Sequence, residues 1–116
     1  MSTYSKNLLS SSVDGMQIVI NSNGTSTANL IHQAPAGASS LDEVYLYAFN
    51  SNVAAATLVL CWGGTNVTTD AMTASITGLN GRVLIVDGRL ITNGRNIWGY
   101  CSTGTVSIDG FVNRIS

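Results

Sequence analysis

Short apolar runs separated by turn residues make up most of the chain. The runs are rich in Val, Ile, Thr and aromatic residues, which favour strands, while Glu, Lys and Arg, the usual residues of helix surfaces, are scarce. Asn-Gly and Asp-Gly pairs separate the runs, and these pairs accept the positive φ angles of tight turns. The pattern predicts strands at residues 16–21, 27–33, 42–50, 56–63, 73–77, 82–87, 96–103 and 105–114. Residues 90–91 belong either to a further short strand or to a turn.

About eight strands, spaced at roughly 8–12 residues, are typical of an antiparallel sandwich or barrel. A jelly-roll-like sandwich fits this number of strands best. We therefore expect an all-β fold, an antiparallel β-sandwich formed by residues 16–116. A hairpin around Thr103-Gly104 is expected to join the last two strands.

Residues 42–50 alternate between two apolar faces, so we expect a central strand that is covered on both sides. Residues 56–63 have the same character. Most aromatic residues of the chain fall inside such strands, where packing in the core is their usual role and a carbohydrate-binding platform is the alternative. The two faces of residues 42–50 are Val44, Leu46 and Ala48 on one side, and Tyr45, Tyr47 and Phe49 on the other.

Residues 1–15 differ from the rest of the chain. They are rich in serine, show no clear alternation, and contain a single pair of adjacent leucines, Leu8 and Leu9. We expect an extended N-terminal arm outside the core, which becomes ordered on a partner. The candidate partner-binding residues of this arm are Tyr4, Lys6, Leu8 and Leu9.

The composition excludes several classes of protein. The 116 residues suffice for one domain, and only 9% of them are charged, against roughly a quarter in an average soluble domain. Ser, Thr and Asn contribute 14, 12 and 11 residues instead. The net charge of −1 gives no electrostatic footprint for nucleic acid, and no apolar run approaches the ~18–20 residues of a membrane helix. No secretory signal is visible, which favours a protein made in the cytoplasm.

The residues offer little catalytic or metal chemistry. His32 is the only histidine and no C-x-x-C pair occurs, so a zinc site is not expected. There is no G-x-S-x-G motif, although serines are too common for counting to dismiss a Ser-His-Asp arrangement. Asp42 and Glu43 are adjacent in a predicted strand and point to opposite faces, which makes them a poor catalytic pair. We expect no catalytic residue, no metal and no cofactor, and a structural role for His32.

Cysteine and arginine each allow two interpretations. Cys61 and Cys101 lie in apolar strands, and we expect two buried thiols, with a disulfide as the alternative if their strands are neighbours. The four arginines lie near turns, which is typical of solvated charges, but arginine also pairs with carboxylates at protein interfaces. They are Arg82, Arg89, Arg95 and Arg114.

Two stretches, residues 45–66 and 90–116, resemble small β-sandwich virion proteins of tailed bacteriophages, the head-decoration or cement class. The matching features are an aromatic–aliphatic strand, a Trp-Gly-Gly-Thr turn from Trp62, and a closing segment that ends in Gly-Phe-Val-Asn-Arg-Ile from Gly110. The resemblance implies a homo-oligomer, often a trimer, that binds the major capsid protein on the exterior of the virion. The alternative is a receptor- or carbohydrate-binding module of a tail fibre or tail tip. A small hydrolase is a more remote possibility.

Overall fold

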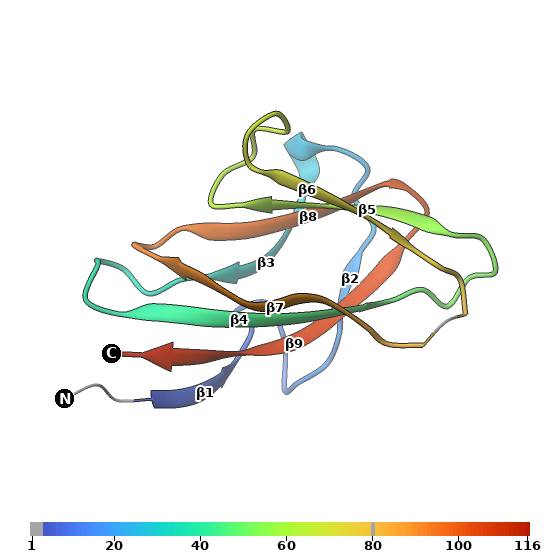
Figure 1. Cartoon of the computed structure of the whole chain (residues 1–116). Coiled ribbons are helices and arrows are strands. Elements are labelled where there is room, and N and C mark those ends of the chain that lie inside the picture. The colour runs from blue at the N-terminus through green and yellow to red at the C-terminus, as the bar shows by residue number, and fades with distance from the viewer. Residues whose placement is uncertain (1–3, 80) are drawn as a thin grey trace.

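The computed structural model describes residues 4–79 and 81–116, which form strands and one short 3₁₀ helix at Thr25–Thr27 (Figure 1). Within these residues there are nine strands. They are β1 (Tyr4–Leu8), β2 (Ile18–Ile20), β3 (Asn29–Gln33), β4 (Leu41–Phe49), β5 (Ala56–Trp62), β6 (Ala71–Ile76), β7 (Val83–Thr92), β8 (Asn96–Thr103) and β9 (Val106–Ile115).

The strands form two antiparallel sheets that pack face to face (Figure 1). One sheet has the order β1-β9-β4-β7, with β2 also pairing along β9, and the other has the order β3-β8-β5-β6. If β1 is left aside, the orders β2-β9-β4-β7 and β3-β8-β5-β6 are those of a jelly roll. The all-β, antiparallel, jelly-roll-like sandwich predicted from the sequence is confirmed.

Two of the Asp-Gly pairs lie inside strands rather than in turns. Gly88 has a φ of 77° within β7, where the register with β4 shifts between Val44 and Tyr45, so it forms a bulge. Gly110 lies within β9, where a Cβ atom would be 2.0 Å from the carbonyl oxygen of Tyr45. Residues 90–91 therefore belong to the single long strand β7.

The hairpin predicted around Thr103-Gly104 is wrong. Gly104 has a φ of 78°, as a tight turn requires, but β8 and β9 belong to different sheets. A turn dipeptide reverses the direction of the chain, but it does not determine whether the strands before and after it pair with each other. Here the turn carries the chain from one layer of the sandwich to the other.

The N-terminal segment is not separate from the sandwich. β1 pairs along the edge of β9, from Tyr4 opposite Ile115 to Leu8 opposite Phe111, and Leu9 is only 1% exposed in the core. The expectation of an arm separate from the sandwich is therefore wrong for residues 4–9: residues 4–8 are an exposed edge strand of one sheet, and Leu9 lies in the core. The strand was missed because an exposed edge strand needs backbone partners but no apolar alternation.

The core is built from aliphatic side chains of the two inner faces. Val44, Leu46 and Ala48 of β4 are fully buried there, as expected. The opposite face of β4, with Tyr45 and Tyr47, is only half-buried and points away from the core, so the expected cover on both sides is wrong. Among the described residues the fully buried core contains no Phe, Tyr or Trp, and of these residue types only Trp62 packs against it, partly buried. The sequence-based assignment of the other aromatic residues to the core is corrected accordingly.

Both cysteines are free thiols in the structure. Cys61 lies opposite Trp98 and Cys101 lies opposite Leu58, so the two cysteines are not cross-strand partners. Both side chains are buried, and burial raises the pKa of each thiol. The prediction of two buried thiols is confirmed.

Candidate functional site

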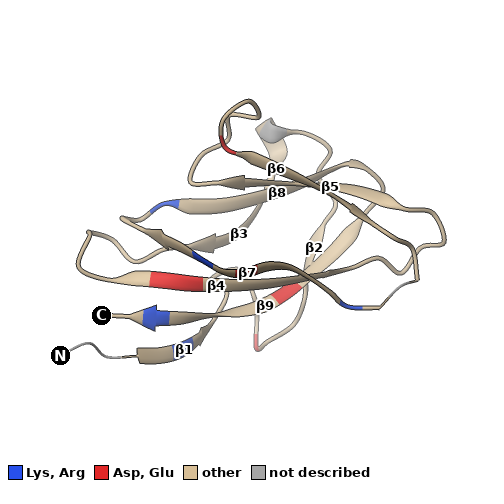
Figure 2. Ribbon diagram, in the orientation of Figure 1, with Lys and Arg blue, Asp and Glu red and all other residues tan. Residues whose placement is uncertain are grey.

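The few charges of the chain are sorted between the two sheets (Figure 2). The strands β3, β5, β6 and β8 of the four-stranded sheet contain no Lys, Arg, Asp or Glu. Every charged residue that lies in a strand belongs to the five-stranded sheet. These residues are Lys6, Asp42, Glu43, Asp87, Arg89, Asp109 and Arg114.

Aromatic rings gather on the outward side of the same sheet. The register of β4 with β9 places Tyr45 opposite Phe111 and Tyr47 opposite Asp109, all facing away from the core. The rings of Tyr45 and Phe111 stack with their centroids 4.9 Å apart and their planes 18° from parallel. We call the outward surface formed by Tyr45, Tyr47, Phe49 and Phe111 the aromatic face.

Two cations cover rings of the aromatic face. Lys6 Nζ lies 4.5 Å from the ring centroid of Phe111, and the Arg82 guanidinium lies 3.6 Å from that of Tyr47. Arg82 Nε also donates to Asp109 Oδ1 at 2.8 Å. Cation–π attraction and the ion pair hold these long side chains against the sheet. The aromatic face thus carries two cations placed over its rings, one of which is paired with a carboxylate.

Exposed apolar side chains extend the aromatic face along its edge strands. Leu8 on β1 is 51% exposed, and Tyr4 on β1 and Leu84 on β7 are also exposed on this sheet. Three of the four residues predicted to bind a partner, Tyr4, Lys6 and Leu8, are alternate residues of β1 and lie beside this face. The fourth, Leu9, is buried in the core and is not available to a partner in this structure.

A small polar cluster borders the aromatic face at its Tyr45 end. The hydroxyl of Tyr45 donates to Glu43 Oε1 at 2.7 Å, and Asn113 Nδ2 donates to the same oxygen at 3.2 Å. These hydrogen bonds, that from Tyr45 foremost, lower the pKa of Glu43, and the bond to Glu43 raises the pKa of Tyr45. The rings and the carboxylate therefore form one hydrogen-bonded surface.

A buried polar network joins the two sheets. Asp42 on β4 is fully buried, and it accepts hydrogen bonds from Arg114 Nε and Nη2 on β9 at 2.9 and 3.0 Å. His32 on β3 lies in the other sheet, and its Nε2 is 2.6 Å from Asp42 Oδ2. The backbone N–H and the hydroxyl oxygen of Ser10 are each 3.0 Å from His32 Nδ1. The network ties the N-terminal segment to both layers.

The hydrogen bonds define the proton positions in this network. A backbone N–H can only donate, so His32 Nδ1 is the acceptor for Ser10 and the ring proton sits on Nε2, which donates to Asp42. Burial lowers the pKa of His32, against the opposing effect of the Asp42 hydrogen bond. Burial alone would raise the pKa of Asp42, but the bonds from Arg114 and His32 outweigh it and lower that pKa.

Ser10, His32 and Asp42 have the order of contacts of a catalytic triad. A triad also needs N–H donors near the nucleophile for the oxyanion. The backbone N–H groups around Ser10 are committed elsewhere: that of Ser10 to His32 Nδ1, that of Ser11 to the carbonyl of Ile31, and that of Ser12 to the carbonyl of Leu9. This bonding fits a structural clamp, the role expected for His32.

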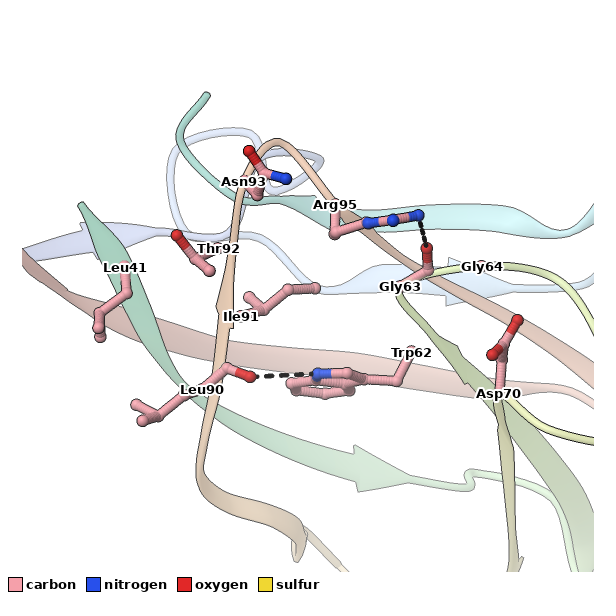
Figure 3. Close-up of a pocket in the computed structure, with 10 residues that line it drawn as sticks. All are labelled: Leu41, Trp62, Gly63, Gly64, Asp70, Leu90, Ile91, Thr92, Asn93 and Arg95. Carbon is pink, nitrogen blue, oxygen red and sulfur yellow. Dashed lines mark hydrogen bonds between the residues drawn. The ribbon is translucent and has the colours of Figure 1, made fainter. Parts of the chain in front are cut away.

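A hollow of about 660 Å³ opens where the ends of β5 and β7 meet (Figure 3). Its apolar lining includes Leu41, Trp62 and Ile91, and two side chains of opposite charge, Asp70 and Arg95, line it as well. The indole N–H of Trp62 donates to the carbonyl of Leu90 at 3.3 Å, which fixes the ring. No single motif in the sequence signalled this hollow, because its residues come from four separate stretches of the chain, at positions 41, 62–64, 70 and 90–95.

No protein-family model matches the chain, and no curated protein matches its sequence. Within residues 4–79 and 81–116, no helix is both long and apolar enough to cross a membrane. The same residues contain no group of three or more His, Cys, Asp or Glu side chains that could hold a metal ion.

Proposed function

We propose that this chain is a structural virion protein of a tailed phage, a capsid decoration protein that binds the major capsid protein through the aromatic face. The supporting observation is that exposed apolar residues, aromatic rings and ordered cations gather on the outside of one sheet. Interfaces are enriched in Tyr, Phe and Arg relative to the rest of a protein surface. The resemblance to head-decoration proteins supplies the identity of the partner.

The chemistry of the aromatic face suits a lasting contact. Lys6 and Arg82 already lie against Phe111 and Tyr47, so part of the side-chain entropy that binding would cost is lost beforehand. Arg82 also has a carboxylate partner in Asp109, which reduces the cost of removing its charge from water. We expect Tyr4, Lys6 and Leu8 to contribute from β1, because they border the same surface.

Decoration stabilises a capsid by mass action, because a protein that binds only the assembled lattice shifts assembly toward it. A homotrimer would present three aromatic faces at once and gain effective concentration at each site. We propose this trimer on the exterior of the virion, after synthesis in the cytoplasm of the host. Light scattering of the purified chain during size-exclusion chromatography measures the oligomer directly, and a monomer would contradict the trimer.

Co-sedimentation with expanded capsids of the encoding phage tests the proposal. The unmodified chain should pellet with capsids, and Arg82→Ala should weaken binding by about tenfold or more, because it removes a central charged contact and uncovers Tyr47. Arg95→Ala is the matched control, since Arg95 lies outside the aromatic face and should bind normally. Failure of the unmodified chain to pellet, or equal binding by Arg82→Ala, would overturn the proposal.

A further inference from the structure

We propose that the hollow beside Trp62 is a binding site for an oligosaccharide. The site shares none of the four rings of the aromatic face. Its residues come from the first position of β4, from the ends of β5 and β7, and from the loops that precede β6 and β8 (Figure 3). It combines apolar walls with a few polar groups that reach it from different loops, as small-molecule sites commonly do.

The two charged residues of the hollow retain hydrogen-bonding capacity. Asp70 accepts from the backbone N–H of Asn66 at 3.1 Å and from the hydroxyl of Thr69 at 3.2 Å. Arg95 donates from Nη1 to the carbonyl of Gly63 at 3.5 Å. Within the described residues Asp70 and Arg95 form no ion pair with each other. An acceptor and a donor group therefore remain for a ligand.

The site is organised before any ligand arrives. A Cβ atom at Gly64 would lie 2.5 Å from Asp70 Oδ2, so the lack of a side chain at Gly64 lets the carboxylate sit against the backbone. The Arg89 guanidinium lies 4.5 Å from the Trp62 ring centroid, and the Trp62 N–H is bound to Leu90. A fixed indole and a fixed carboxylate lower the entropy that binding would cost.

The arrangement favours a ligand that is rich in hydroxyl groups. A hydroxyl donates to a carboxylate and accepts from a guanidinium, so neighbouring sugar hydroxyls can satisfy Asp70 and Arg95 together. A ligand with a single net charge would meet one like charge in the same hollow. The apolar surfaces of Leu41, Trp62 and Ile91 suit the C–H faces of sugar rings. The volume of about 660 Å³ lies within the usual range of roughly 300–1,000 Å³ for ligand sites.

A glycan array of bacterial surface oligosaccharides, probed with the purified full-length chain, tests the site. The chain should bind at least one glycan, and Arg95→Ala and Trp62→Ala should each weaken that binding at least tenfold. Arg95→Ala is the decisive variant, because Arg95 is exposed and its loss should leave folding intact. Arg82→Ala is the matched control and should bind the glycan normally. This control also separates the outcome from capsid binding, which the proposed function assigns to Arg82.

A fluorescence titration with the bound glycan locates the site independently. Trp62 and Trp98 are the two tryptophans of the chain, so Trp98→Phe leaves Trp62 as the only indole reporter. Saturation with the glycan should shift the emission of this variant. Absence of any bound glycan, unchanged affinity of Arg95→Ala, or unchanged Trp62 emission at saturation would each overturn the proposal.

Discussion

The two sheets of the sandwich share a core but differ on their outer sides. The four-stranded sheet has no charged residue in its strands, and none of the large exposed apolar side chains within residues 4–79 and 81–116 lies in those strands. Its outward-facing Val59 and Cys61 are buried, although neither belongs to the core between the sheets. The five-stranded sheet carries seven charged residues and exposes Tyr4, Leu8 and Leu84.

The difference shows that the scarcity of charge is not uniform. On the five-stranded sheet several charges are placed against a specific partner: Lys6 on Phe111, Arg82 on Tyr47 and Asp109, and Arg114 on Asp42. The outer side of the other sheet also carries two half-buried rings, Trp98 and Tyr100, but its strands hold no charged residue. The charges placed against rings are therefore what distinguish the five-stranded sheet as a surface for a partner. The buried and the exposed ion pairs of the five-stranded sheet should also contribute differently to the free energy of unfolding.

The largest expected effect follows removal of the buried charge. Asp42→Ala leaves His32 Nε2 without its acceptor and the Arg114 guanidinium without its counter-charge. Breaking a buried ion pair from one side costs about 3–5 kcal/mol. Urea denaturation of Asp42→Ala and of the unmodified chain should show a loss of this size in the free energy of unfolding.

Asp109→Asn is the matched change on the outer side of the same sheet. Its partner Arg82 is half exposed to water, and exposed pairs contribute about 0.2–1 kcal/mol. A loss for Asp42→Ala no larger than that for Asp109→Asn would mean that the buried network does not organise the sandwich.

The buried network shows how far the sequence alone could lead. Asp42 is in phase with Val44, Leu46 and Ala48, so the alternation that predicted their burial also signalled a buried carboxylate. Its partner Arg114 is 72 positions away, and nothing local relates the two. Strand existence and the sandwich could be predicted because alternation and turn residues are local signals.

The aromatic face shows what could not be predicted from the sequence. Tyr45 and Tyr47 are as apolar in pattern as Val44 and Leu46, so alternation separated the two faces of β4 but could not say which one the second sheet covers. That choice depends on the packing of the whole molecule. The aliphatic face was selected as the core, and the larger rings remained outside, where Arg82 and Lys6 cover them.

The adjacent residues Leu8 and Leu9 give the next largest effect. Leu9 is 1% exposed and Leu8 is 51% exposed, so one leucine belongs to the core and the other borders the aromatic face. Leu9→Ala should lower the free energy of unfolding by about 2–5 kcal/mol, while Leu8→Ala should change it by about 0.5 kcal/mol or less. Thermal and urea unfolding measure both.

Capsid co-sedimentation should distinguish Leu8→Ala from Leu9→Ala in the opposite sense to unfolding. Leu8→Ala should weaken capsid binding, because it removes exposed apolar surface beside Phe111. Leu9→Ala should bind normally at a temperature where it remains folded. Equal stability losses for the two variants would show that the N-terminal segment does not pack as described.

The smallest expected effect is a dependence of stability on pH. Because the pKa of His32 is lowered in the folded protein, the unfolded chain holds more protons on this residue below its ordinary pKa of 6.5. Its contribution to stability is therefore complete above about pH 6.5 and is lost as the pH falls below that value. Protonation of Nδ1 would also set two donors, the ring N–H and the Ser10 N–H, against each other.

Protonation of Asp42 causes a second loss of folding stability in more acidic solution. The pKa of Asp42 is lowered from 3.8, so its contribution is present above that value and is lost as the pH falls through the lowered pKa. One proton changes the free energy of unfolding by at most about 1.4 kcal/mol per pH unit. Urea denaturation between pH 8 and pH 5 should show the His32 part alone, and His32→Gln should remove it. If the unmodified chain and His32→Gln lose stability equally between pH 8 and pH 5, His32 is not the group that titrates. The pH dependence would then not come from the hydrogen bonds of His32 to Ser10 and Asp42.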